Sequence, residues 1–193
     1  TLALVLGNVP QAAYAADAVD QITLYGGLAS AIGAAPQADD GALNGFAWSA
    51  NGKTMELYLT PAQLGFDEPL LVGEIDSISY QTKKSGGQGD VDWTFYIYTK
   101  DLDPDNPPWY GVRLNAEPYF AINPNAPANT WNTWSSREGT NQLRFFDADA
   151  SGFYGTFNDP TLGELVAEDT FTWPNGKQVA YRNREVLTFR LGT

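Results

Sequence analysis

Apolar and polar residues alternate with a period of two over several short stretches of the chain. The clearest stretch is residues 91–99, where one set of side chains alternates with another: Val91, Trp93, Phe95 and Ile97 against Asp92, Thr94, Tyr96 and Tyr98. Residues 54–60, 74–82 and 185–191 show the same alternation, and the last of these puts Leu187, Phe189 and Leu191 on one side. A period of two is typical of half-buried β-strands. The pattern therefore predicts an all-β protein, with Trp93, Phe95, Leu143 and Phe145 in its core.

Two Asn-Gly pairs separate alternating stretches. Asn51-Gly52 and Asn175-Gly176 favour tight hairpins, because both central positions of such a turn need a positive φ. We expect about ten to twelve short strands and find neither a repeat nor a linker. The resulting prediction is a single antiparallel two-sheet sandwich, jelly-roll-like, over residues 17–193.

Residues 1–16 differ from the rest because they are apolar and uncharged. Leu2, Leu4, Val5 and Leu6 belong to a run that is apolar on both faces of a strand, and such a strand needs cover on both sides. Three interpretations stay open: a core strand of its own domain, a strand that inserts into a neighbouring copy, or the remnant of a signal peptide cleaved near residues 13–15. The run is too short to span a bilayer.

The amino-acid composition excludes several kinds of catalytic and metal-binding site. The 193 residues include no cysteine and no histidine, which excludes disulfides, thiolate metal sites and the commonest general base. The net charge of −12 argues against nucleic acid or an anionic membrane as partner. It fits an extracellular or cell-surface protein in salt or calcium, and solubility alone is the alternative explanation.

One carboxylate motif has the form of a catalytic site. Glu74-Ile75-Asp76 resembles the start of the Glu-x-Asp-x-x-Glu motif of family 16 glycosidases, which need two carboxylates beside the scissile bond. Ser79 stands where the second glutamate would be, so the acid/base pair is broken. We therefore expect no enzymatic activity.

Two acidic loops have the spacing of calcium ligands, with oxygens at loop positions 1, 3 and 5. These oxygens belong to Asp101, Asp103 and Asp105 in one loop and to Asp147, Asp149 and Ser151 in the other. The sequence therefore favours Ca²⁺ as a candidate cofactor. The alternative is that both loops are polar turns, which the same residue types favour.

Aromatic residues in the middle of the chain offer a stacking platform for a sugar. The candidates are Trp109, Tyr110, Trp131 and Trp134, with Asn115, Glu117 and Asn132 as hydrogen-bond partners. Packing of these rings in the core is the alternative, and the alternating spacing favours it.

The same part of the chain carries a resemblance. The strings WYGVRLNAEPYF, WNTWS, NQLRFFD, YGTF and TLGEL resemble a block in uncharacterised secreted β-sandwich proteins, jelly-roll-like, of bacteria and archaea. The resemblance covers roughly residues 74–193 and implies the fold but no activity. It also implies one more strand after the segment that ends at Thr193.

These observations lead to two function hypotheses. The first is a structural subunit of an extracellular filament or tube, in which residues 1–9 fill the gap of a missing strand in an adjacent copy. The alternative is a secreted carbohydrate-binding module with a polysaccharide partner. The path of residues 1–9 separates them, since pairing within their own chain speaks against assembly by strand exchange.

Overall fold

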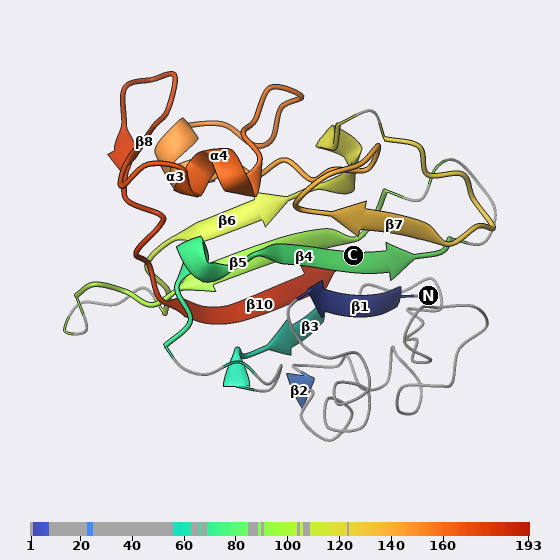
Figure 1. Cartoon of the computed structure of the whole chain (residues 1–193), viewed down its shortest axis with the longest axis horizontal. Helices are drawn as coiled ribbons and strands as arrows, with labels where there is room; N and C mark the ends of the chain where they lie inside the picture. Colours follow the sequence, from blue (N-terminus) through green and yellow to red (C-terminus); the bar gives the residue numbers. More distant parts are fainter. Residues whose placement is uncertain are drawn as a thin grey trace.

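The computed structural model describes residues 2–7, 23–24, 56–62, 66, 69–84, 89, 91–103, 105, 109–122 and 124–193 (Figure 1). The strands in this part of the chain are β1 (Leu2–Gly7), β2 (Thr23–Leu24), β3 (Glu56–Leu59), β4 (Ser77–Thr82), β5 (Thr94–Thr99), β6 (Arg113–Ala116), β7 (Asn132–Ser135), β8 (Phe171–Thr172), β9 (Gln178–Val179) and β10 (Val186–Gly192). The short helices are η2 (Val72–Glu74), η3 (Pro118–Phe120), α3 (Ala148–Ser151) and α4 (Leu162–Val166).

Every pair of neighbouring strands among these elements is antiparallel. One sheet has the order β1-β4-β7, a second has the order β2-β3-β10-β5-β6, and β8 pairs with β9. The described part of the chain contains more strand than helix, which confirms the prediction of a mostly β protein.

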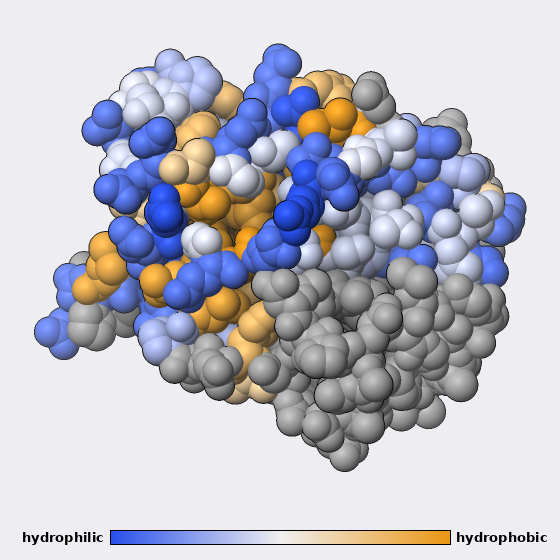
Figure 2. All heavy atoms as spheres, viewed as in Figure 1, coloured by the Kyte–Doolittle hydropathy of each residue, from blue (hydrophilic) through white to orange (hydrophobic). Residues whose placement is uncertain are grey.

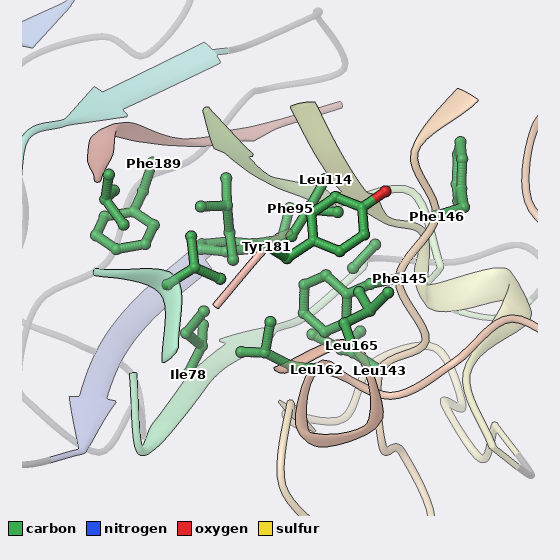
Figure 3. Packing of buried hydrophobic residues seen from close by; sticks show 14 of the residues in the cluster. Ile78, Phe95, Leu114, Leu143, Phe145, Phe146, Leu162, Leu165, Tyr181 and Phe189 are labelled. Atoms are coloured by element: carbon green, nitrogen blue, oxygen red, sulfur yellow. The ribbon is translucent and has the colours of Figure 1, made fainter. Parts of the chain in front are cut away.

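The core contains side chains from both larger sheets. Tyr80 of β4 and Phe95 of β5 have ring centroids 6.0 Å apart, and the Tyr80 hydroxyl donates to the Trp93 carbonyl at 3.0 Å. Phe95 in turn lies 5.8 Å from Phe189 of β10. Figure 3 shows Ile78, Leu114, Phe145 and Tyr181 in the same cluster. The predicted core residues Trp93, Phe95, Leu143 and Phe145 are all buried, as expected.

Short helices and one tight hairpin complete the C-terminal third. The Thr161 hydroxyl caps α4 and Glu164 reaches back to the Thr161 amide, so the helix begins with a capping box. Its Leu162 and Leu165 are buried with Phe145 (Figure 3). The β8–β9 pairing confirms a hairpin at Asn175-Gly176, but the turn differs from the predicted one, because Gly176 has a positive φ of 86° and Asn175 does not. The other, at Asn51-Gly52, lies outside the described residues.

The last strand corrects one detail of the predicted pattern. The β10–β5 register shifts between Val186 and Thr188, as in a β-bulge. Val186 is therefore buried, whereas Leu187 is only half-buried and does not share the core side with Phe189 and Leu191. An extra residue in one strand changes the face of every residue beyond it, and period-two spacing does not reveal it.

Strand β1 is the predicted apolar N-terminal segment. It pairs with β4 from Leu2 opposite Thr82 to Gly7 opposite Ser77. The expected position was a groove of an adjacent copy, but in the structure, which holds one chain, the partner strand belongs to the same chain. β4 pairs with β7 along one edge, and β1 covers its opposite edge, which would otherwise leave backbone groups unpaired.

No helix in the part of the chain that the structure describes is both long and apolar enough to cross a bilayer.

Candidate functional site

The five-stranded sheet has a second face that is aromatic and polar rather than apolar. On β5, Phe95 and Ile97 face the core, so Tyr96 and Tyr98 face the other way. Residues that are directly opposite across antiparallel strands share a face. The register places four such residues in one row across β3, β10, β5 and β6: Tyr58, Arg190, Tyr96 and Asn115. We call this surface, with Tyr98, Trp109 and Tyr110, the tyrosine face.

Tyr98 lies at the centre of the aromatic cluster. Its ring centroid is 4.6 Å from that of Trp109, 5.1 Å from Tyr110, 6.0 Å from Tyr96 and 6.3 Å from Tyr58. Tyr98 is 4% exposed, whereas Trp109 is 57% exposed. The cluster therefore presents one large accessible indole on a support of buried and half-buried rings.

The backbone around Gly111 fixes the position of Trp109. The Gly111 amide donates to the Thr99 carbonyl at 2.8 Å, and the Val112 amide donates to the Thr99 hydroxyl at 2.9 Å. A Cβ at Gly111 would lie 2.4 Å from the Lys100 carbonyl oxygen. Only glycine allows this close approach of two backbone segments, and the approach carries Trp109 over the sheet.

Arg190 supplies the charge at the centre of the face. Its guanidinium carbon lies 4.3 Å from the Tyr96 ring centroid and 6.0 Å from that of Tyr58, within the range of cation–π contact. It also donates to a carboxylate oxygen of Glu56. Burial raises the pKa of Tyr98 to about 12. Burial, followed by the charge of Glu56, raises the pKa of Tyr58 as well. Both phenols therefore stay neutral at ordinary pH.

Two buried polar atoms of this row have no hydrogen-bond partner in the described structure: Asn115 Oδ1 and Arg190 Nε. Buried polar atoms are nearly always paired. One is an acceptor and the other a donor, so an ordered water fits both chemically. The tyrosine face thus combines apolar rings with at least one hydrogen-bond donor and one hydrogen-bond acceptor that no protein group occupies.

The structure brings together two of the four aromatic residues that were predicted to bind a ligand. Trp109 and Tyr110 are neighbours, with ring centroids 4.9 Å apart. Trp134 is instead fully buried in the core, where its indole nitrogen donates to the Thr82 hydroxyl at 2.8 Å, so its assignment to a ligand platform is wrong. Trp131 is half-buried, 5.7 Å from the Lys83 ammonium, and flanks β7 in the other sheet.

Sequence reasoning missed four members of the face: Tyr58, Tyr96, Tyr98 and Arg190. The alternation along β5 already separates Tyr96 and Tyr98 from the core residues, and this signal was sufficient to find them. The pairing of β10 with β3 and β5 joins distant segments, and no short-range pattern indicates it.

Residues of the first predicted calcium loop form consecutive turns. The Asp103 amide donates to Asp101 Oδ1 and the Asp105 amide to Asp103 Oδ1, both at 3.1 Å. Such side-chain-to-backbone bonds are what polar turns use. The residues remain accessible, and calcium at this loop stays a prediction.

The second predicted calcium loop is largely engaged in other bonds. Asp147 caps α3 by accepting from the Asp149 and Ala150 amides, each at 3.1 Å, and its other oxygen accepts from Tyr181. Ser151 donates to the Phe153 carbonyl at 3.0 Å. No group of three or more acidic side chains suited to a metal ion occurs among the residues described. Calcium here also stays a prediction.

The carboxylates of the glycosidase-like motif have structural partners. Glu74 accepts from the Leu71 amide at 2.9 Å, and both oxygens of Asp76 accept from Arg137 Nη1 at 2.8–2.9 Å.

Comparison with protein-family models, curated proteins and solved structures finds no match to this chain. The resemblance to secreted sandwich proteins thus stays a prediction, and function is argued from the geometry of the side chains.

Proposed function

We propose that this protein is an extracellular carbohydrate-binding β-sandwich module, jelly-roll-like in topology, and that the tyrosine face is its binding surface. The observation that carries the proposal is Trp109: a large apolar ring, 57% exposed, held at a fixed angle by the buried ring of Tyr98. An aromatic side chain kept accessible in this way does not contribute its full area to folding. Exposed aromatic surface next to polar groups is typical of ligand sites.

A sugar chain matches the face in chemistry. Pyranose rings have apolar C–H faces that stack on aromatic rings and hydroxyls that both donate and accept hydrogen bonds. Beside the rings lie the guanidinium of Arg190, the carboxylate of Glu56 and the phenol hydroxyls. The net charge of −12 disfavours an acidic polysaccharide. We therefore infer a neutral polysaccharide, bound without chemical change.

The test is binding of soluble neutral polysaccharides, such as β-glucan, xylan and mannan, followed by calorimetry and affinity electrophoresis. Trp109→Ala should weaken binding about tenfold, which corresponds to the loss of about 1.4 kcal/mol. Leu102→Ala is the matched control, because Leu102 is an exposed apolar residue of the preceding loop and is not a member of the tyrosine face. Absence of binding by the wild type, or equal affinity of Trp109→Ala, would contradict the proposal.

A second candidate is the structural subunit assembled by strand exchange. The observation that favours it is the position of β1, which is an outer strand of the β1-β4-β7 sheet and adds to the edge of β4. The same backbone bonds would form if β1 of one copy paired with β4 of another, as in domain swapping. In a structure of one chain, β1 has no strand of another copy to pair with, so the β1–β4 pairing agrees with both arrangements. We rank this function below sugar binding because the tyrosine face gives sugar binding a defined set of side chains.

A further inference from the structure

A cavity of about 630 Å³ opens beside α4, away from the residues of the tyrosine face. This volume lies within the range of about 300–1,000 Å³ that is usual for small-molecule sites. Its apolar walls include Phe153, Phe171 and Trp173, and its polar side includes Arg144, Asp159 and Glu164. On the face that Figure 2 shows, hydrophobic residues are exposed between hydrophilic ones around the position of α4 in Figure 1.

The aromatic wall is rigidly supported from behind. Phe171 and Trp173 have ring centroids 5.0 Å apart in an edge-on arrangement. The Trp173 indole nitrogen donates to the Tyr181 hydroxyl at 2.7 Å, and this hydroxyl donates to Asp147 at 2.9 Å. The wall therefore exists before any ligand arrives, which lowers the entropy cost of binding.

Part of the lining belongs to the segment from Gly152 to Pro160, which carries Phe153. This segment turns at Gly152 and Gly155, whose φ angles are +82° and +49°. A Cβ at Gly155 would lie 2.4 Å from the ring of Phe120, so the segment packs tightly at this point. Phe153 nevertheless stays 38% exposed.

The polar side is ordered by its own hydrogen bonds. Asp159 accepts from the Thr156 amide at 2.6 Å and from its hydroxyl at 2.9 Å. Arg144 Nη1 donates to the Asp159 carbonyl at 2.5 Å. A guanidinium has five N–H donors, and among the described residues this is the one hydrogen bond that Arg144 makes. Donors therefore remain for a ligand in the cavity.

The charges decide the class of ligand. Two carboxylates and one guanidinium line the cavity, so an anion meets net repulsion there. A neutral molecule with hydroxyls can accept from Arg144, donate to the carboxylates and lay an apolar face on the aromatic wall. From this combination we propose that the cavity binds a single neutral sugar residue. The proposal stands on the cavity alone and does not require binding at the tyrosine face.

The experiment uses the full chain and individual neutral methyl glycosides of glucose, galactose and mannose, with galacturonate as the charged comparison. Binding is measured by saturation-transfer difference NMR and by the tryptophan fluorescence of the whole protein, to which Trp173 contributes. We expect saturable binding of at least one neutral glycoside in preference to galacturonate. Phe153→Ala should weaken it about tenfold by removing one stacking surface, and Arg144→Gln should weaken it similarly by removing donors.

Two controls make the outcome specific. Phe157→Ala changes an exposed aromatic residue of the same segment that does not line the cavity, and Trp109→Ala changes the tyrosine face. Neither should alter monosaccharide binding. Phe153→Leu retains bulk and checks that a loss in Phe153→Ala is not a loss of folding. The proposal is overturned if no neutral glycoside binds saturably, if galacturonate binds better, or if Trp109→Ala abolishes binding while Phe153→Ala does not.

Discussion

The hydroxyl of Tyr181 donates a hydrogen bond of 2.9 Å to a carboxylate oxygen of Asp147, 34 residues earlier in the chain. Both residues are buried. The other oxygen of Asp147 accepts from two backbone amides at the start of α3. One side chain thus joins a helix start to the segment that precedes β10.

Asp147→Ala should destabilise the protein by about 2–4 kcal/mol, because it removes a helix cap and leaves the buried Tyr181 hydroxyl without its acceptor. Urea denaturation followed by tryptophan fluorescence measures this. Asp147→Asn keeps the shape and can still accept from the α3 amides, so its loss should be clearly smaller. Equal stability of Asp147→Ala and wild type would show that the bond contributes nothing.

The same carboxyl group predicts a pH dependence of stability. Burial raises the pKa of Asp147 above its ordinary value, so in the window above the unfolded pKa of about 3.9 the folded state binds more protons than the unfolded state. The free energy of unfolding of the wild type, relative to that of Asp147→Asn, should therefore fall as the pH rises from the unfolded pKa of about 3.9 through the higher folded pKa.

Glu164 should show the opposite sign. Its bonds to the Thr161 amide and hydroxyl lower its pKa. Stability relative to Glu164→Gln should therefore rise with pH up to the unfolded value of about 4.3 and be lost as the pH falls through the folded pKa. Parallel urea series at several pH values measure both differences, and two slopes of the same sign would contradict these assignments.

The core was predictable from the sequence because burial on a strand has a local signature. Trp93 and Phe95 follow the alternation. Leu143 and Phe145 also lie two positions apart, as side chains on one face of a strand do, although neither belongs to a strand named in the structure. The tyrosine face was only half predictable. Trp109 and Tyr110 are adjacent in sequence, but Arg190 and Tyr58 reach them through pairing of distant strands. Trp134 follows the alternative of core packing, which the alternating spacing favoured, and its hydrogen bond to the buried Thr82 hydroxyl is the part that no sequence pattern indicated.

Glycine substitutions at two sites should change stability in opposite directions. At Gly111 an added Cβ would lie 2.4 Å from the Lys100 carbonyl oxygen, so Gly111→Ala should cost about 1–3 kcal/mol and weaken polysaccharide binding by moving Trp109. At Gly163, within α4, nothing lies within 4 Å of an added Cβ. Gly163→Ala should therefore stabilise the protein by about 0.5–1 kcal/mol. Thermal melts compare the pair, and destabilisation by Gly163→Ala would refute the helix-propensity argument.

Calcium should raise the melting temperature if the Asp101–Asp105 loop binds it, because a ligand of the folded state stabilises by mass action. Asp103→Ala should remove this shift, since Asp103 both lies at the middle of the ligand spacing and accepts from the Asp105 amide. Asp149→Ala tests the second loop in the same way. Equal melting temperatures in calcium and in chelator would leave both loops as polar turns.

Strand β1 provides the test of strand exchange. Deleting residues 1–9 removes the strand that covers the edge of β4 from Ser77 to Thr82. The deletion variant should melt at a lower temperature, since the edge amides and carbonyls lose their partners. A synthetic peptide with the sequence of residues 1–9 should restore the melting temperature in a concentration-dependent way, because it binds the folded state only.

The matched control is the same peptide with proline at positions 4 and 5. Neighbouring residues on a strand point their amides to opposite sides, so one of these two substitutions removes a bond to β4 in either register. This peptide should not restore stability. Rescue by the native peptide would show that β4 accepts a strand from another molecule, and light scattering of the full-length protein would then show whether copies exchange it. A deletion variant with unchanged melting temperature and no peptide binding would exclude exchange at β4 and leave the sugar-binding module as the proposed function.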